Sequence, residues 1–353
     1  MKKLIYSFAV SALLSLLLIA AAGCTADTAN THNTNENIAD DAPYILCSGF
    51  SEYDWTRNIL GDNPGGIRLE LLNQSGSDMH SYQPSVSDMV KLANCDLLIY
   101  TGGLSEFWID KAAQSSISSQ ASEAGGQLLS LMTYFEDKPM LFSDYSQTAH
   151  EHSHEGHGHE EHEHEHSSDE HEHELDEHLW LSLKNAQLFC AEIANAVSEL
   201  DPDNSEYYSE ALMAYTNELA ELDKAFEAAV AAAETDVLIF ADRFPFTYML
   251  QDYGLHCHAA FDGCSAETEA SFETVIALAC ELNSDELDHI IVLKNSPSGE
   301  KLANTIIAAA ERSNVKISAL DPLQSFSAKE LSEGYTYINA MKKNLEVLSE
   351  CLN

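Results

Sequence analysis

Basic residues are scarce in this chain of 353 residues. It has 17 Lys plus Arg against 58 Asp plus Glu, which gives a formal net charge of −41 at pH 7. A surface of this sign repels nucleic acid and anionic lipid headgroups, so the composition excludes nucleic acid as a natural partner and excludes charge as a means of membrane attachment. The same negative field concentrates divalent cations near the protein.

The cysteines do not form a disulfide pattern. None of the eight is spaced as Cys-x-x-Cys, and seven remain when Cys24 is set aside. Scattered cysteines in a chain long enough for an ordinary core are not those of a small disulfide-bonded protein. Cys47, Cys190 and Cys280 lie in apolar runs and are predicted to be buried thiols, whereas a bridge between Cys257 and Cys264 is left open.

One segment lacks hydrophobic side chains altogether and is rich in histidine. Between residues 150 and 173 there is no Lys or Arg, and the remaining residues are mostly carboxylates. Such a segment cannot build a core, while imidazole is a common ligand for zinc. We predict a disordered loop that gathers metal at low affinity and loses it as pH falls, because protons compete for the same nitrogens. Its histidines are His150, His152, His154, His157, His159, His162, His164, His166, His171 and His173.

The N-terminus has the organisation of an export signal. Lys2 and Lys3 precede an apolar run that ends in Ala-Ala-Gly-Cys24. This ending resembles the bacterial lipobox, which implies cleavage before Cys24 and lipidation of its thiol; an ordinary signal peptide or an uncleaved anchor is the alternative. We expect a lipoprotein signal peptide at 1–23, a flexible tether at 24–42, and a protein anchored by lipid outside the bacterial cell membrane.

The rest of the chain alternates short apolar runs with helical patterns, which predicts an α/β protein with mainly parallel sheets. About 310 residues exceed one ordinary core, so two α/β lobes are expected, at 43–182 and 234–353. The predicted strands are 44–48, 67–72, 97–100, 237–240, 289–293 and 315–320.

A helical region at 183–233 separates the two lobes. Leu183 to Leu200 has a helical pattern, residues 201–204 break it, and residues 205–233 contain neither Gly nor Pro. Apolar residues at three- and four-residue steps give the second helix one hydrophobic face. We predict a long rigid helix at 204–233 that joins the lobes; a packing helix inside one domain is the alternative.

Two further histidines stand on either side of the histidine-rich segment. His80 lies in the polar stretch Gly76-Ser-Asp-Met-His-Ser-Tyr-Gln-Pro84, and His178 lies in Asp176-Glu-His-Leu-Trp-Leu. Both are candidate metal ligands. Asp176 or Glu177 is a candidate for orienting an imidazole through its second nitrogen.

These segments resemble motifs of the metal-binding lipoproteins that serve ABC transporters for zinc and manganese. Residues 77–84 are similar to the element Pro-His-x-Tyr-Glu-Pro, and residues 176–185 to the element Asp-Pro-His-x-Trp-Leu-x-Pro-x-Asn. Leu320-Asp-Pro-Leu323 is similar to the segment that carries the last acidic ligand, and 263–271 to Gly-Ile-Ser-x-x-x-Glu-Pro-Ser. The resemblance implies a metal site in the cleft between lobes, with His80, His178 and Asp321 as ligands.

One position departs from that family. Arg243 stands where the third ligand, a His or Glu, is expected, and a guanidinium cannot coordinate a cation. We expect Arg243 to turn toward a carboxylate, either Glu269 or Asp321, while Asp242, water or another side chain completes the site. His256, Cys257, His258 and Cys264 are nearby soft ligands, although His-Cys-His is more typical of a strand with alternating faces.

The resulting hypothesis is an exported lipoprotein that captures Zn²⁺ and passes it to an ABC permease and its ATPase, without chemistry of its own. Two imidazoles favour zinc, and Mn²⁺ remains a possible ligand. A manganese or iron receptor of the same fold is the alternative. A surface zinc hydrolase, which needs an open coordination position and a general base, and a surface metal buffer or adhesin are less favoured. We expect a monomer.

Overall fold

The computed structural model describes residues 42–353 except 75, 113–126, 137–175, 262 and 264–269. The predicted signal peptide, Cys24, most of the tether and the histidine-rich segment 150–173 lie outside the described residues, as do Cys264 and Glu269. Residues 41–353 form one compact unit by their contacts. The domain boundaries given above stay predictions.

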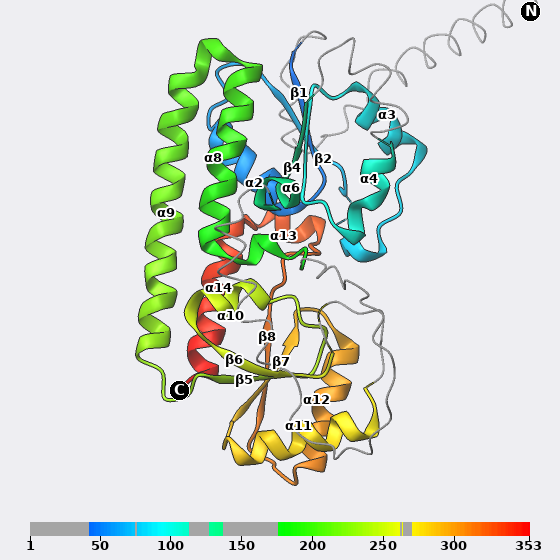
Figure 1. Ribbon diagram of the computed structural model, residues 1–353, viewed down its shortest axis with the longest axis vertical. Coiled ribbons are helices and arrows are strands. Elements are labelled where there is room, and N and C mark those ends of the chain that lie inside the picture. The colour runs from blue at the N-terminus through cyan, green and yellow to red at the C-terminus, as the bar shows by residue number, and fades with distance from the viewer. Residues whose placement is uncertain (1–41, 75, 113–126, 137–175, 262, 264–269) are drawn as a thin grey trace, which may run out of the picture. The chain divides into compact units, whose positions relative to one another are not determined.

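Two four-stranded parallel sheets confirm the predicted α/β architecture (Figure 1). Their strand orders are β2-β1-β3-β4 and β6-β5-β7-β8. Central strands such as β1 and β7 are buried along their whole length, as expected when helices cover both faces of a parallel sheet. The strands are β1 (Tyr44–Cys47), β2 (Arg68–Leu71), β3 (Leu97–Tyr100), β4 (Gln127–Ser130), β5 (Val237–Phe240), β6 (His256–Ala259), β7 (His289–Leu293) and β8 (Lys316–Leu320).

Helices connect the strands, and short 3₁₀ turns carry several residues discussed below. The α-helices are α2 (Phe50–Leu60), α3 (Val86–Asn94), α4 (Phe107–Ala112), α6 (Leu131–Glu136), α8 (Leu183–Leu200), α9 (Ser205–Ala231), α10 (Thr247–Tyr253), α11 (Phe272–Ser284), α12 (Pro297–Ala309), α13 (Ala328–Ser332) and α14 (Tyr337–Cys351). The 3₁₀ turns are η1 (Met79–Ser81), η2 (Leu104–Glu106), η4 (Leu179–Leu181) and η5 (Pro202–Asn204).

Helix α9 is the predicted long connector. It has 27 residues and so extends about 40 Å at 1.5 Å per residue. Its predicted apolar face is buried, and it contacts α2 and α8 beside the first sheet and α10 and α14 beside the second. Figure 1 shows α9 running alongside both sheets. The prediction of a rigid helix shared by the lobes is therefore confirmed.

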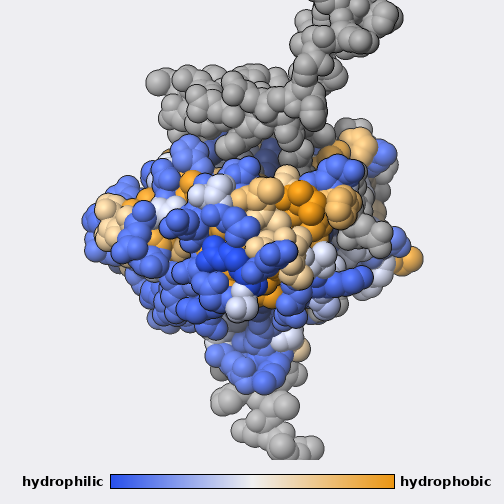
Figure 2. All heavy atoms as spheres, turned by 90° about the horizontal axis from the view of Figure 1, so that it is seen from below, coloured by the Kyte–Doolittle hydropathy of each residue, from blue (hydrophilic) through white to orange (hydrophobic). Residues whose placement is uncertain are grey.

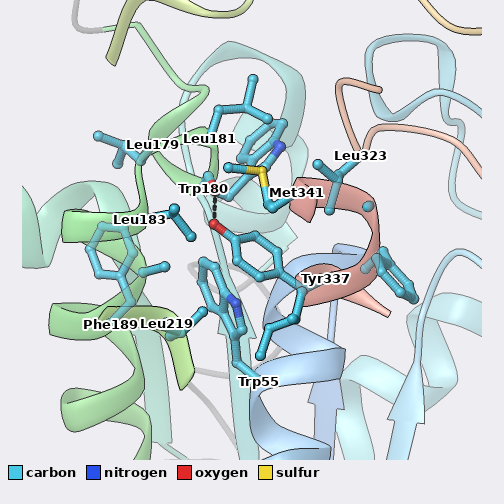
Figure 3. Close-up of a cluster of buried hydrophobic side chains, with 14 of the residues drawn as sticks. Trp55, Leu179, Trp180, Leu181, Leu183, Phe189, Leu219, Leu323, Tyr337 and Met341 are labelled. Atoms are coloured by element: carbon cyan, nitrogen blue, oxygen red, sulfur yellow. Dashed lines mark hydrogen bonds between the residues drawn. The ribbon is translucent and has the colours of Figure 1, made fainter. Parts of the chain in front are cut away.

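The core continues from one lobe into the other (Figure 3). Trp55 of α2 packs edge-on against Tyr337 of α14, with ring centroids 5.1 Å apart. The Tyr337 hydroxyl donates to the carbonyl oxygen of Trp180 in η4 at 2.6 Å, and the Trp180 indole donates to the carbonyl oxygen of Pro322 at 2.9 Å. Since η4 immediately follows His178, this packing fixes the backbone of the site in both lobes.

The cysteine predictions are partly confirmed. Cys47 and Cys190 are buried free thiols, whereas Cys280 is exposed, because it lies on the solvent side of α11 and not on its apolar side. The segment His-Cys-His forms the edge strand β6, as its alternation predicts.

The face shown in Figure 2 is largely hydrophilic, and the largest of its groups of hydrophobic residues lies to the right of the centre. Within the residues that the structure describes, no helix combines the length and apolarity needed to span a bilayer.

Candidate metal centre

His80 lies in η1, the next element along the chain after β2. Asp78 caps this turn, because its Oδ1 accepts the backbone N–H of His80 at 3.0 Å. The preceding turn is held by the second lobe, where the Phe326 N–H donates to the Gly76 carbonyl oxygen at 3.0 Å. Gly76 has φ +63°, and a Cβ there would lie 1.9 Å from the carbonyl oxygen of Phe326, so only glycine allows this approach.

His178 is the residue before η4 and is 2% exposed. Its Nδ1 lies 2.5 Å from Asp176 Oδ1, and the same oxygen accepts its backbone N–H at 2.9 Å. The second lobe holds Asp176 in turn: Thr247 donates to its Oδ2 and Tyr248 to its carbonyl oxygen, both at 2.8 Å. The position of this imidazole therefore depends on both lobes.

The two imidazoles face each other through their Nε2 atoms, which are 3.2 Å apart. Two nitrogens bound to one zinc ion at about 2.05 Å, at the tetrahedral angle, lie about 3.3 Å from each other. The observed separation thus matches one edge of a tetrahedral coordination site.

The Nδ1 atom of His80 is also bound to its surroundings. Ser105 Oγ lies 2.5 Å from it, Ser105 donates to Glu177 Oε1 at 2.5 Å, and Glu177 Oε1 itself is 3.1 Å from the ring nitrogen. Each imidazole therefore has an oxygen partner at Nδ1. This arrangement keeps the proton on Nδ1 and leaves the Nε2 lone pair for a cation.

Both neighbouring carboxyls are ionised at neutral pH. Burial opposes their ionisation, but hydrogen bonds with His178 and Thr247 outweigh it at Asp176 and hold its pKa below the usual value. At Glu177, burial is likewise outweighed by hydrogen bonds with His80 and Ser105, and the pKa falls to about 2. Two negative charges thus stand behind the two imidazoles, an electrostatic setting that favours a dication between them.

Asp242 lies apart from this pair of imidazoles. It follows β5 and is 5% exposed. Its oxygens accept the backbone N–H groups of Arg243 at 2.9 Å and of Leu293 at 3.1 Å, so the carboxylate connects β5 to the end of β7. It is not in the group of residues whose ligand atoms converge at His80 and His178. Its assignment as a ligand stays a prediction.

Asp321 has a different set of partners. Its Oδ2 lies 2.8 Å from Lys294 Nζ and accepts the Tyr335 hydroxyl at 3.0 Å, and its Oδ1 accepts the Leu323 N–H at 2.9 Å. The structure places it outside the same convergent group. Asp321 stands at the position of the family's acidic ligand, and its own role as a ligand stays a prediction.

Arg243 does turn toward a carboxylate, as expected, but not toward Asp321. It contacts Asp78 Oδ2 at 2.8 Å, across the two lobes. Asp321 is instead paired with Lys294, and Glu269 lies outside the described residues. Because the other oxygen of Asp78 caps the turn of His80, Arg243 supports the position of that imidazole from the opposite lobe.

Sequence reasoning missed Ser105 and Gln324 at this site. The Gln324 side-chain nitrogen is 2.8 Å from His80 Nε2, and Ser105 bridges His80 and Glu177 as described. His80, Glu177 and His178 form a group with ligand atoms within 4.8 Å of one another. Neither missed residue belongs to a spacing pattern with the histidines, so only the folded chain brings them together.

A second group of possible ligands is found on the second lobe. His258 of β6 lies 3.2 Å from Asp285 and 3.9 Å from Glu281, which flank the end of α11. All three side chains are at least 30% exposed. These are contacts between partly exposed side chains at the surface, of which the one with Asp285 is a hydrogen bond.

The cavity beside His80 contains two further acidic residues. Glu52 and Glu106 line it together with His80, Glu177 and Gln324. They are 1% and 3% exposed, in contrast to the great majority of carboxylates in proteins. Burial, assisted by the neighbouring Glu52, raises the pKa of Glu106 to about 8, so this group carries a proton at neutral pH.

The fold and this pair of imidazoles place the chain among two-lobed metal-binding proteins. The family model of the zinc-uptake complex component A, periplasmic, known as ZnuA, matches residues 45–351. The chain belongs to this family.

Curated relatives support that membership. The chain is 26% identical over 319 residues to the zinc-binding lipoprotein AdcA of Streptococcus pneumoniae strain R6, covering 90% of this chain and 57% of that protein. It is 26% identical over 336 residues to the high-affinity zinc uptake system protein ZnuA of Bacillus subtilis, covering 95% and 94%. The chain thus spans little more than half of the length of the streptococcal relatives.

Solved structures share the fold. The metal-dependent lipoprotein YcdH of Bacillus subtilis superposes with a TM-score of 0.66 at 23% identity, covering 88% of this chain and 99% of that one. Zn(II)-bound AdcA of Streptococcus pneumoniae gives a TM-score of 0.63 at 23% identity, covering 88% and 57%. At these identities the likeness concerns the architecture of the two lobes.

Proposed function

We propose that this protein is the zinc-binding component of an ABC uptake system, which captures Zn²⁺ between His80 and His178 and delivers it to a membrane permease with its ATPase. The observation that carries the proposal is the 3.2 Å separation of the two Nε2 atoms, each ring having its Nδ1 held by an oxygen partner. The names of the relatives in Streptococcus pneumoniae and Bacillus subtilis agree with zinc.

The rest of the proposal concerns the protein's location, its oligomeric state and the role of the histidine-rich segment. The protein acts outside the cytoplasmic membrane as a monomer, held there by lipid on Cys24, and the segment 150–173 gathers metal at low affinity for the central site. It transports and performs no covalent chemistry. Binding through two imidazoles favours zinc over manganese, because the harder ion prefers oxygen donors.

Competition between ions tests the proposal. A variant that lacks residues 150–173, titrated with zinc against a chromophoric chelator, is expected to bind one ion per chain. Excess Mn²⁺ is expected not to displace it. In a strain without this protein, growth in zinc-limited medium is expected to fall and to recover with the intact gene. A Mn²⁺ affinity above that for Zn²⁺, or the lack of a one-to-one site, contradicts the proposal.

The contact of Asp176 with His178 gives a further prediction. Replacing Asp176 with Asn keeps the shape of the side chain but removes the charge behind the imidazole. We expect zinc affinity to fall by about tenfold, at the lower end of the roughly 10–100-fold typical for partners of metal ligands. Calorimetric titration measures it, with Thr247→Val as the control that removes only the outer hydrogen bond. An unchanged affinity in Asp176→Asn shows that the charge has no role.

A further inference from the structure

We propose that the side-chain carboxamide of Gln324 supplies the second lobe's donor to the bound ion. The inference rests on the proposed zinc site at His80 and His178. Gln324 follows β8 and is 4% exposed. Its side-chain nitrogen lies 2.8 Å from His80 Nε2, the atom that faces His178, so the carboxamide reaches the place where the two imidazoles converge.

The backbone around Gln324 is held by both lobes. Phe326 donates its N–H to Gly76 of the His80 turn, and the Trp180 indole donates to the carbonyl oxygen of Pro322. These bonds flank Gln324 on either side in sequence. The carboxamide is therefore placed relative to His80 and His178 by contacts with the very segments that carry them.

Leu323, the residue before Gln324, has an unusual backbone. Its φ is +55°, in the left-handed region that residues with a Cβ rarely adopt. Such a conformation is strained and persists only where the surroundings impose it, often at a binding site. Here Asp321 Oδ1 accepts the Leu323 N–H at 2.9 Å, and Asn344 binds the backbone N–H and carbonyl of Asp321, each at 2.8 Å. The strained turn directs Gln324 toward His80.

The carboxylate of Asp321, in contrast, already has a cationic partner. Lys294 lies 2.8 Å from its Oδ2, and the Tyr335 hydroxyl donates to the same atom. A metal ion at Asp321 has to displace an ammonium group that also contacts Glu330. Gln324 is uncharged and its carboxamide already contacts His80 Nε2, so a turn of its terminal torsion brings the side-chain oxygen to that place.

The carboxamide can contact His80 when the site is empty and the ion when it is bound. With the His80 proton on Nδ1, the Nε2 lone pair accepts an N–H from Gln324. A half-turn of the carboxamide replaces nitrogen with oxygen, and amide oxygens are metal ligands in proteins. The first coordination sphere then contains two imidazoles and one neutral oxygen from this set of residues. The negative charges of Glu177 and Asp176 stand behind the rings and do not touch the ion. Because none of these three ligands is charged, we expect the ion to be held less tightly than by a carboxylate at position 324.

Two substitutions at position 324 that are expected to affect zinc affinity differently test the proposal. Gln324→Ala removes a ligand, so the zinc dissociation constant is expected to rise by roughly 10–100-fold or more. That range is typical when a residue that hydrogen-bonds a metal ligand is lost. Gln324→Glu keeps the length and adds a charged oxygen, so its affinity is expected to equal or exceed that of the wild type. Gln127→Ala, an exposed carboxamide on β4, is the matched control and is expected to bind as the wild type. Thermal unfolding without metal checks that each variant is folded.

A spectroscopic readout reports whether the carboxamide responds to the bound ion. The side-chain amide signals of Gln324 in a ¹H–¹⁵N spectrum, assigned by their loss in Gln324→Ala, are expected to shift when zinc is added. Unchanged signals, wild-type affinity in Gln324→Ala, or equal weakening in Gln324→Glu and Gln324→Ala each overturn the proposal. The proposed function fails differently, since the wild-type protein then shows no one-to-one zinc site.

Discussion

Replacing His80 and His178 together with alanine is expected to abolish tight zinc binding and leave the chain folded. The double substitution removes both nitrogen donors that lie 3.2 Å apart, and zinc sites derive their affinity from direct ligand bonds. Since a complete site contributes about 10–16 kcal/mol, loss of two ligands is expected to weaken binding by about a thousandfold or more. Titration against a chromophoric chelator, in the variant without residues 150–173, measures this directly.

A matched control is available on β6. His256→Ala with His258→Ala removes the same number of imidazoles from the second lobe, where His258 contacts Asp285 at the surface, away from His80 and His178. That variant is expected to keep wild-type affinity and stoichiometry. Thermal unfolding of the metal-free proteins shows whether loss of the buried His178 affects folding. Tight one-to-one zinc binding in the variant with both His80 and His178 replaced would contradict the assignment of these residues as ligands.

The architecture was predictable where strands are apolar throughout. Residues 44–48, 97–100 and 289–293 are hydrophobic runs, and they form the buried strands β1, β3 and β7. Strand β4 (Gln127–Ser130) was not predicted, because it is an edge strand of four residues whose side chains are exposed or half-buried. Its position comes from pairing with β3, which local sequence does not reveal.

The site was predictable only where a local motif carries it. His80 and His178 stand in recognisable segments, and Asp176 is two residues from the imidazole that it contacts. The pairing of Arg243 with Asp78 joins residues 165 positions apart, and Gln324 meets His80 across 244 positions. Such contacts are set by how the lobes pack around η4 and α14. The family motif therefore indicated the two imidazoles but not the second-lobe residues that contact His80 and its turn.

The paired carboxyls of Glu52 and Glu106 impose a pH dependence on folding. Glu106 accepts the Gly102 N–H at 2.8 Å and has Glu52 as a buried acidic neighbour. Burial and this neighbour raise its pKa to about 8, above the value of 4.5 for an exposed glutamate. The folded chain therefore binds a proton that the unfolded chain releases. Stability from this group is complete below pH 4.5 and is lost as pH rises through the window up to about 8.

Replacing Glu106 with Gln is thus expected to stabilise the metal-free protein increasingly as pH rises. Glutamine stays neutral and keeps an oxygen to accept the Gly102 N–H, so below pH 4.5 the variant is expected to match the wild type. Above pH 8 the gain in unfolding free energy approaches an upper limit of about 5 kcal/mol, from a shift of about 3.5 pKa units at 1.36 kcal/mol each. Denaturant unfolding across pH 4–9 measures it, with Glu218→Gln on the exposed face of α9 as the control. If the gain in unfolding free energy is the same at every pH, packing and not a buried proton accounts for the difference between Glu106→Gln and the wild type.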